Sequence, residues 1–242
     1  MSSTLQSAPT RSVCRLTLFL SAGFTLAVVT GCAGGGAAEL SARPRPQALT
    51  AATVSVPRDG RLSIALSAFS KRAGLSGQVA GDATAAAEGR GELTLNVTGG
   101  GSADGALQLG HAFSNDSDRQ VELDLAIRFS MELSTTVETA AIEGDATLRA
   151  RLYVRDGANR LLRAIDVTGF AATHGSLKRT TRESQQLTLT LGPGQGAQVF
   201  LGIDAAADTL RSERSASLTV RITDFVVDAS TRPAPGAAGD GR

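Results

Sequence analysis

The side chains best suited to acid-base or metal chemistry are few in this sequence and are not grouped. Only two histidines occur, His111 and His174. Neither belongs to a His-Glu-x-x-His pattern, so their spacing does not indicate a zinc site. A Gly-x-Ser-x-Gly nucleophile elbow is absent as well. We expect His111 to be a partly buried strand residue and His174, beside Gly175 in a polar loop, to be solvated.

Carboxylates are plentiful, but their spacing places them on the solvent side of strands. Glu122, Asp124 and Glu132 alternate with apolar residues and share their face with Arg128. A glycosidase requires two carboxyl groups about 5 to 10 Å apart across a sugar-binding cleft, and no pair stands out here. We therefore predict no catalytic residues, no enzymatic activity and no cofactor.

The loop from Asn115 to Asp118 is the one local cluster with metal character. Its sequence, Asn-Asp-Ser-Asp, groups oxygen ligands of the kind that Ca²⁺ takes in sets of six to eight. The loop lacks the glycine and the distal glutamate of an EF-hand, and the same residue types cap backbone groups in ordinary turns. We assign no metal ligands and keep calcium binding open for this loop.

The segments that must position these side chains have a period of two. The clearest case is residues 121–133, where seven apolar residues alternate with polar ones, as in a strand with one buried face. Nine segments of this kind predict strands: Leu62 to Leu66, Leu93 to Val97, Leu107 to Leu109, Val121 to Leu133, Leu148 to Val154, Ile165 to Val167, Leu187 to Leu191, Val199 to Ile203 and Leu218 to Ile222.

Short strands without intervening helices predict an all-β fold. We expect an antiparallel two-layer β-sandwich with Greek-key or jelly-roll connections, and a closed barrel is the main alternative. Asp156-Gly157, followed by Ala158 and Asn159, is the clearest hairpin turn. Phe113 and Phe129 fall on the apolar side of their strands and should lie in the core.

The N-terminus has the layout of an export signal. Arg11 and Arg15 precede an uncharged apolar run over residues 16–30, which ends in Val29-Thr30-Gly31-Cys32. These four residues resemble the lipobox of bacterial lipoprotein precursors. The resemblance implies cleavage after Gly31 and a diacylglycerol on the Cys32 sulfur. The run is shorter than the roughly 20 residues of a membrane span. An ordinary secretory signal cut after Ala38 is the main rival.

Composition divides the remaining chain. We expect a signal peptide over residues 1–31, a flexible tether over 32–50, a folded domain over 51–228 and a disordered tail over 229–242. Removing the signal leaves 22 basic and 23 acidic residues without a basic tract, so nucleic acid is not an expected partner. The other cysteine, Cys14, would leave with the signal.

Two classes of function remain open at this stage. The first is a lipid-anchored envelope protein, on the outer membrane if the cell is Gram-negative, whose non-catalytic sandwich is structural or binds proteins. The second is a carbohydrate-binding surface module. Sugar platforms use tyrosine or tryptophan faces, and the chain has no tryptophan and a single tyrosine, Tyr153. We therefore favour the first class.

Overall fold

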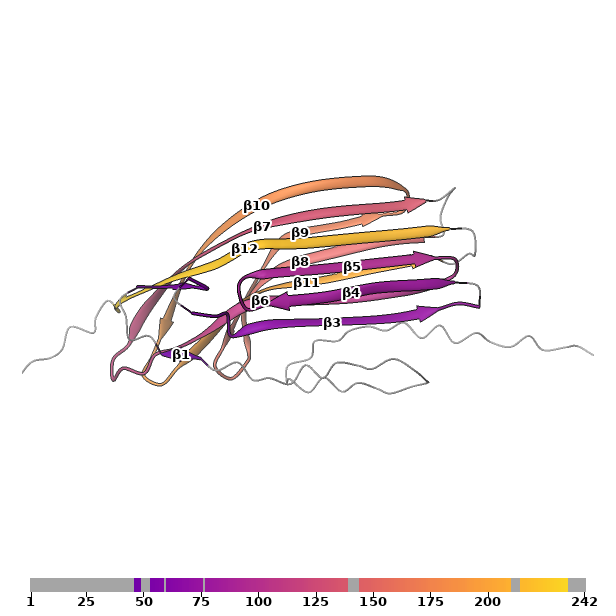
Figure 1. Ribbon diagram of the computed structural model, residues 1–242. Helices are drawn as coiled ribbons and strands as arrows, with labels where there is room; N and C mark the ends of the chain where they lie inside the picture. The colour runs from indigo at the N-terminus through magenta and orange to yellow at the C-terminus, as the bar shows by residue number, and fades with distance from the viewer. Residues whose placement is uncertain are drawn as a thin grey trace, which may run out of the picture.

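The computed structural model describes residues 46–48, 53–58, 60–75, 77–138, 144–209 and 214–234. Twelve strands form two six-stranded sheets that lie face to face (Figure 1). Sheet A contains β1 (Gln47–Ala48), β3 (Ile64–Ala73), β6 (Gly101–Ser114), β8 (Gly144–Asp156), β9 (Leu161–Ala172) and β11 (Gly196–Thr209). Sheet B contains β2 (Thr53–Val56), β4 (Gln78–Ala86), β5 (Arg90–Thr98), β7 (Val121–Glu138), β10 (Gly175–Leu191) and β12 (Ser215–Pro233).

The connectivity is that of a jelly roll. Sheet A has the order β6-β11-β8-β9, and sheet B has the order β5-β12-β7-β10. The chain passes between the sheets at every connection in this set except the β8–β9 hairpin, which is the double Greek-key pattern of eight-stranded jelly rolls. Strands β1 and β3 extend sheet A beside β6, while β2 and β4 extend sheet B. The predicted antiparallel two-layer sandwich is confirmed.

Alternation along the strands explains why the sheets stack. In β7, residues 123–137 at odd positions are buried, while Arg128, Glu132 and Ser134 at even positions are not. Burying apolar side chains of this size contributes about 1.5 to 3 kcal/mol each. The core combines the inner faces of both sheets, and Phe113 and Phe129 lie in it at 0% and 3% exposure, as predicted.

Each of the nine predicted strands corresponds to an observed strand, and β1, β2 and β4 were not predicted. Strand β4 has the sequence QVAGDATAA, which offers one large apolar residue and so gives a weak periodic signal. Its Gly81 is required by packing, because a Cβ there would lie 2.5 Å from Cε2 of Phe69 in sheet A. The predicted hairpin joins β8 to β9, and the residue with positive φ is Asn159 (66°) rather than Gly157.

A bulge divides β12 into two halves with opposite parity. Before the register shift between Thr223 and Val226, the buried residues have even numbers, from Ala216 to Ile222. After it, the buried residues have odd numbers: Phe225, Val227 and Ala229. Asp224 takes a positive φ of 55° within the bulge. The first half pairs with β5 and the second with β2. The strand continues through Pro233, past the domain boundary expected at 228.

Two strands, one from each sheet, form edges of the sandwich. Strand β9 forms an edge of sheet A and β10 an edge of sheet B. Lys178, Arg179, Arg182 and Glu183 place charges on both faces of β10. Such charges hinder pairing of an open edge with another strand.

Strand β1 and the end of β12 lie at the same end of the sandwich, which we call the terminal pole (Figure 1). The loops 115–120, 157–160 and 192–195 also lie there, because Gln47 pairs with Phe113 and Pro233 with Val121. The opposite pole carries the turns after β3 and β9.

Candidate functional site

The two histidines take the positions expected for structural residues. His111 lies on β6 and is only 3% exposed, so its burial is more complete than expected. Its Nδ1 accepts a hydrogen bond from the Ser63 backbone N–H at 3.2 Å, and its ring centroid lies 4.9 Å from that of Phe113. Burial lowers the pKa of His111 to about 4. His174 is exposed in the bend between β9 and β10.

The loop considered for calcium is held by Asn115. This residue is 1% exposed, and its amide nitrogen donates to the carbonyl oxygens of Arg119, Leu191 and Gly192 at 2.7 to 3.0 Å. Its Oδ1 accepts from the backbone N–H and the hydroxyl of Ser117. The amide therefore caps backbone carbonyl groups and connects the loop 115–120 to the start of the loop 192–195 at the terminal pole. No group of three or more potential metal-ligating side chains occurs among the described residues.

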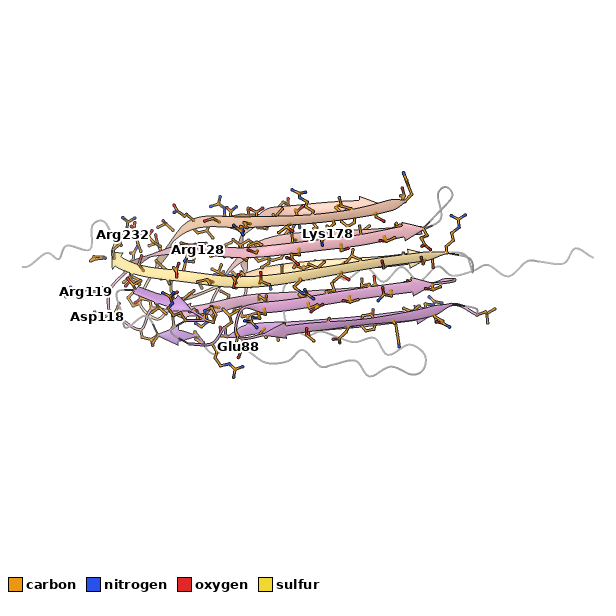
Figure 2. The ribbon with its side chains drawn as sticks, turned by 45° about the horizontal axis from the view of Figure 1, so that its top comes forward. Glu88, Asp118, Arg119, Arg128, Lys178 and Arg232 are labelled. Atoms are coloured by element: carbon orange, nitrogen blue, oxygen red, sulfur yellow. The ribbon has the colours of Figure 1, made fainter. Side chains whose placement is uncertain are left out.

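The outer face of sheet B carries mainly polar side chains, among them the labelled Arg128, Lys178 and Arg232 (Figure 2). The acidic residues expected on the solvent side of β7 lie here, and two of them, Glu122 and Asp124, are bound by cross-strand partners. Arg232 Nε lies 2.7 Å from Glu122 and 3.3 Å from Asp124, and an ion pair joins Arg128 to Asp228. Exposed pairs of this kind contribute about 0 to 1 kcal/mol each, so they order the surface more than they stabilise the fold.

A groove of about 370 Å³ crosses this face over β2, β12, β7 and β10. The residues that line it are mostly polar: Thr53, Asp124, Leu125, Ala126, Gln186, Leu187, Thr188, Asp228, Ala229 and Ser230. Hydrogen bonds from Thr188 to Asp124 and from Ser55 to Asp228, both 2.6 Å long, fix its two carboxylates. Aromatic side chains do not line this groove.

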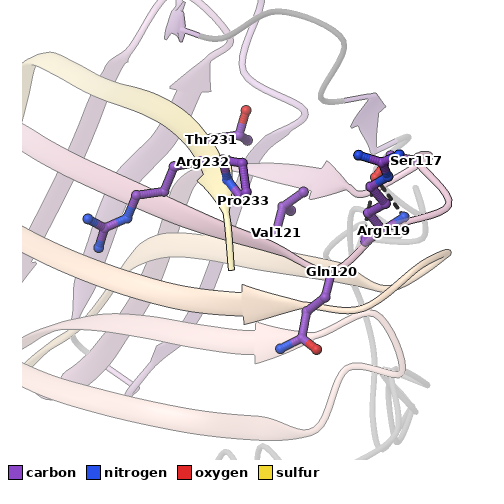
Figure 3. Close-up of a pocket in the computed structure, with 7 residues that line it drawn as sticks. All are labelled: Ser117, Arg119, Gln120, Val121, Thr231, Arg232 and Pro233. Carbon is purple, nitrogen blue, oxygen red and sulfur yellow. Dashed lines mark hydrogen bonds between the residues drawn. The ribbon is translucent and has the colours of Figure 1, made fainter. Parts of the chain in front are cut away.

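A smaller pocket of about 220 Å³ lies at the terminal pole, where β7 begins and β12 ends (Figure 3). Arg119 and Arg232 both line it, but their side chains point in different directions. Arg232 is also engaged by Glu122 and Asp124. The two guanidinium groups therefore do not form a joint anion site.

The outer face of sheet A carries an aromatic pair that the sequence pattern did not reveal. Tyr153 on β8 and Phe200 on β11 are direct cross-strand partners, and their ring centroids lie 5.1 Å apart with 25° between the planes. Phe200 is 3% exposed, whereas Tyr153 is partly exposed. The guanidinium carbon of Arg155 lies 5.3 Å from the Phe200 centroid and 5.9 Å from that of Tyr153.

Gly202 determines how the tyrosine ring lies. This glycine follows Phe200 on the same face, and a Cβ there would lie 2.7 Å from Cε2 of Tyr153. One edge of the ring therefore occupies the space above Gly202 that a side chain would fill. This placement presents an amphipathic ring beside the polar side chains of the next cross-strand row.

That row is rich in planar hydrogen-bonding groups. Arg151 pairs with Gly202 on one side and with Asp166 on the other, and Gln108 lies opposite Gly202 on β6. Arg151 Nε lies 2.5 Å from Asp166. The pKa of Arg151 is raised, chiefly by its hydrogen bond to Asp166 and also by Tyr153. Guanidinium, carboxylate and amide groups thus form the cross-strand row next to the tyrosine ring.

Three aspartates continue this face toward the opposite pole. Burial raises the pKa of Asp104, Asp204 and Asp208, and in Asp204 the positive charge of Arg151 opposes that rise. The register places Asp204 opposite Arg149, whereas Asp208 faces Asp145. The face therefore combines one aromatic ring with hydrogen-bond donors and acceptors of both charges.

Comparison with known proteins does not assign a family. No family model and no curated protein matches the chain. Among solved structures, the chain is similar to the CBM22-1 xylan-binding domain of Paenibacillus barcinonensis Xyn10C, with 13% identity, coverage of 67% of this chain and 85% of that chain, and a TM-score of 0.22. It is also similar to a CBM4 structure, with 14% identity, coverage of 57% and 84%, and a TM-score of 0.20.

A third similar structure is the family 11 carbohydrate-binding module from Clostridium thermocellum in complex with a mixed-linked tetrasaccharide. Here the identity is 10%, the coverage 66% of this chain and 87% of that chain, and the TM-score 0.19. Superpositions of this quality establish no ligand for the present chain.

The lipobox residues Val29, Thr30, Gly31 and Cys32 lie outside the described residues, as do most of the tether and the last eight residues of the tail. Within the described ranges, no helix is long and apolar enough to span a membrane.

Proposed function

We propose that this protein is a glycan-binding module of the bacterial cell envelope, anchored through a lipidated Cys32, and that the outer face of sheet A is its binding face. The observation that carries the proposal is Tyr153, which lies over Gly202 and adjoins Arg151. An aromatic ring that lies along a surface can stack on the apolar face of a pyranose ring, while planar polar side chains around it bind hydroxyl groups.

The choice between the two open classes of function rests on the character of the two outer faces. Protein interfaces concentrate aromatic and apolar residues at their centre and have few charges there. The described groove of sheet B is lined by two carboxylates, three hydroxyls and an amide, together with four small or aliphatic residues. The platform of sheet A has one apolar neighbour, Phe200, beside the tyrosine ring, and the next cross-strand row supplies charged and amide groups. Both faces therefore suit a hydroxyl-rich ligand better than an apolar protein surface.

Binding of polysaccharides to the mature chain tests this proposal. Affinity electrophoresis and calorimetry against neutral and acidic soluble polysaccharides should give retardation by at least one polymer. Tyr153→Ala should weaken binding about 10- to 30-fold, the equivalent of roughly 1.4 to 2 kcal/mol of stacking. Tyr153→Phe should retain most of the affinity, because it keeps the ring.

Gln186→Ala, in the groove of sheet B, is the matched control and should leave the affinity unchanged if sheet A is the binding face. Thermal melting of each variant separates loss of binding from loss of folding. If no polysaccharide binds, or if Tyr153→Ala binds as tightly as the parent chain, the glycan proposal is wrong, and a structural or protein-binding role takes its place.

The anchor is proposed on the lipobox alone and has its own test. The two acyl chains of a thioether-linked diacylglycerol provide stable membrane attachment, since each buried methylene contributes about 0.8 kcal/mol. Intact-mass measurement should show a chain that begins at Cys32 and carries the lipid. Cys32→Ala should release the protein into the soluble fraction, whereas a chain that begins after Ala38 would contradict the anchor.

A further inference from the structure

The start of β9 exposes two consecutive leucines at the terminal pole. Leu161 and Leu162 are each 57% exposed. They lie at a register shift: Leu161 pairs with Arg155 and Arg163 with Val154, so Leu162 has no residue opposite it. A bulge of this kind turns side chains out of the regular pattern of a sheet. The sequence therefore holds two large apolar side chains outside the core on an edge strand.

Cations flank the leucines on both sides. Arg160 Nε lies 2.6 Å from Asp156, and this arginine remains 80% exposed at its side chain. Arg163 is exposed and has no ion-pair partner among the described residues. The combination of apolar side chains with neighbouring arginines matches the interface of a bilayer that contains anionic lipid, where apolar groups enter the acyl boundary and cations contact headgroups.

The point at which the chain enters the fold brings this patch near the proposed anchor. Gln47 pairs with Phe113, Phe113 with Ala197, and Ala197 with Asp156, so one cross-strand row connects β1 to the β8–β9 hairpin. Strand β9 follows β8 at the edge of the sheet, so four strand spacings, about 19 Å, separate β1 from β9. The fifteen residue steps from Cys32 to Gln47 have a root-mean-square reach of about 20 Å if flexible, so the patch can reach the membrane that holds Cys32.

We propose that Leu161 and Leu162, flanked by Arg160 and Arg163, contact the lipid surface and orient the anchored domain with its terminal pole toward the bilayer. This inference rests on the proposed lipid anchor. Without the contact, a flexible tether would leave the domain free to tumble. With it, the opposite pole, which exposes Leu75 and Leu177, points away from the membrane.

Paramagnetic relaxation tests the orientation in the lipidated full-length mature protein. The protein is reconstituted in nanodiscs of phosphatidylcholine and phosphatidylglycerol that carry a gadolinium-chelating lipid, and leucine methyl relaxation is measured. We expect the paramagnetic rates of Leu161 and Leu162 to exceed that of Leu75 at least about tenfold, because the poles are roughly 40 Å apart along the strands. Equal rates at both poles, with the anchor intact by mass, would overturn the contact and assign the leucines to a protein partner.

Two double variants test whether these two leucines hold the terminal pole at the membrane, rather than exposed leucines in general. Leu161→Ser with Leu162→Ser should lower the paramagnetic rates of the backbone amides around Arg163 at least about threefold. Leu75→Ser with Leu177→Ser, the matched change at the opposite pole, should leave them unchanged. If mass measurement finds no lipid on Cys32, the anchor itself fails. If the lipid is present and the first double variant behaves like the parent, only the lipid contact is wrong.

Discussion

Acid sensitivity centred on His111 offers the most direct quantitative test of the core. The imidazole is 3% exposed, and its Nδ1 accepts from the Ser63 backbone N–H. The neutral ring therefore carries its proton on Nε2, which is buried without a hydrogen-bond partner in the described part of the chain. Protonation would place a second N–H against the Ser63 donor and a charge in the core. Both effects favour the neutral ring in the folded state.

The sign and the size of the effect follow from linkage. The folded pKa of His111 is about 4, below the ordinary value of 6.5, so the unfolded chain binds more protons in this range. Stability is full above pH 6.5 and falls as the pH drops toward 4. Between pH 7 and pH 5 the loss should be about 2 kcal/mol, and it should level off at roughly 3 kcal/mol below pH 4.

Urea unfolding of the mature chain at several pH values measures this loss. With a slope of about 2 kcal/mol per molar urea, the contribution of His111 should lower the midpoint by roughly 1 M between pH 7 and pH 5. His111→Gln keeps an acceptor for Ser63 but cannot titrate, so its midpoint should change much less over this range. His174→Gln, which removes the exposed histidine, should behave like the parent chain. Equal pH dependence in His111→Gln and the parent would refute the reasoning.

Three further changes test other parts of the structure. Asn115→Ala removes an amide that donates hydrogen bonds to three carbonyl groups, so it should destabilise the fold by about 2 to 4 kcal/mol. Thermal melting measures this loss, and an unchanged melting temperature would mean that other contacts hold the two loops. Gly202→Ala should displace the Tyr153 ring and weaken polysaccharide binding at least about fivefold, at a cost of roughly 1 to 3 kcal/mol in stability, and unaltered binding would count against the platform. Asp224→Ile should cost about 1 to 2 kcal/mol because of the positive φ, whereas Asp224→Gly should not, and chemical denaturation compares the two.

The architecture could be predicted from the sequence because alternation is a local property. Residues 121–133 specify a strand and its buried face without reference to any partner, and the same holds for the other eight predicted segments. Strand β4 was missed because alanine and glycine fill its inner positions and are accommodated by Phe69 from the other sheet. Such compensation between distant residues leaves no local pattern.

The candidate site could not be predicted for a related reason. Phe200 lies at a position of β11 that faces outward, between residues of the same strand that are buried. Only the pairing of β11 with β8 brings Phe200 next to Tyr153. The same pairing places Gly202 under the tyrosine ring. Tyr153 stands out in the sequence as the single tyrosine, but cross-strand register depends on the whole sheet, so its neighbours Phe200 and Gly202 could be found only in the structure.

The charged edge formed by β10 would have a further consequence if the protein is anchored as proposed. Attachment to a bilayer would confine many copies to one plane and raise the frequency of sideways collisions far above that in free solution. A seventeen-residue edge with free backbone groups would then be a template for lateral polymerisation. Lys178, Arg179, Arg182 and Glu183 interrupt that template, so crowded copies can remain separate.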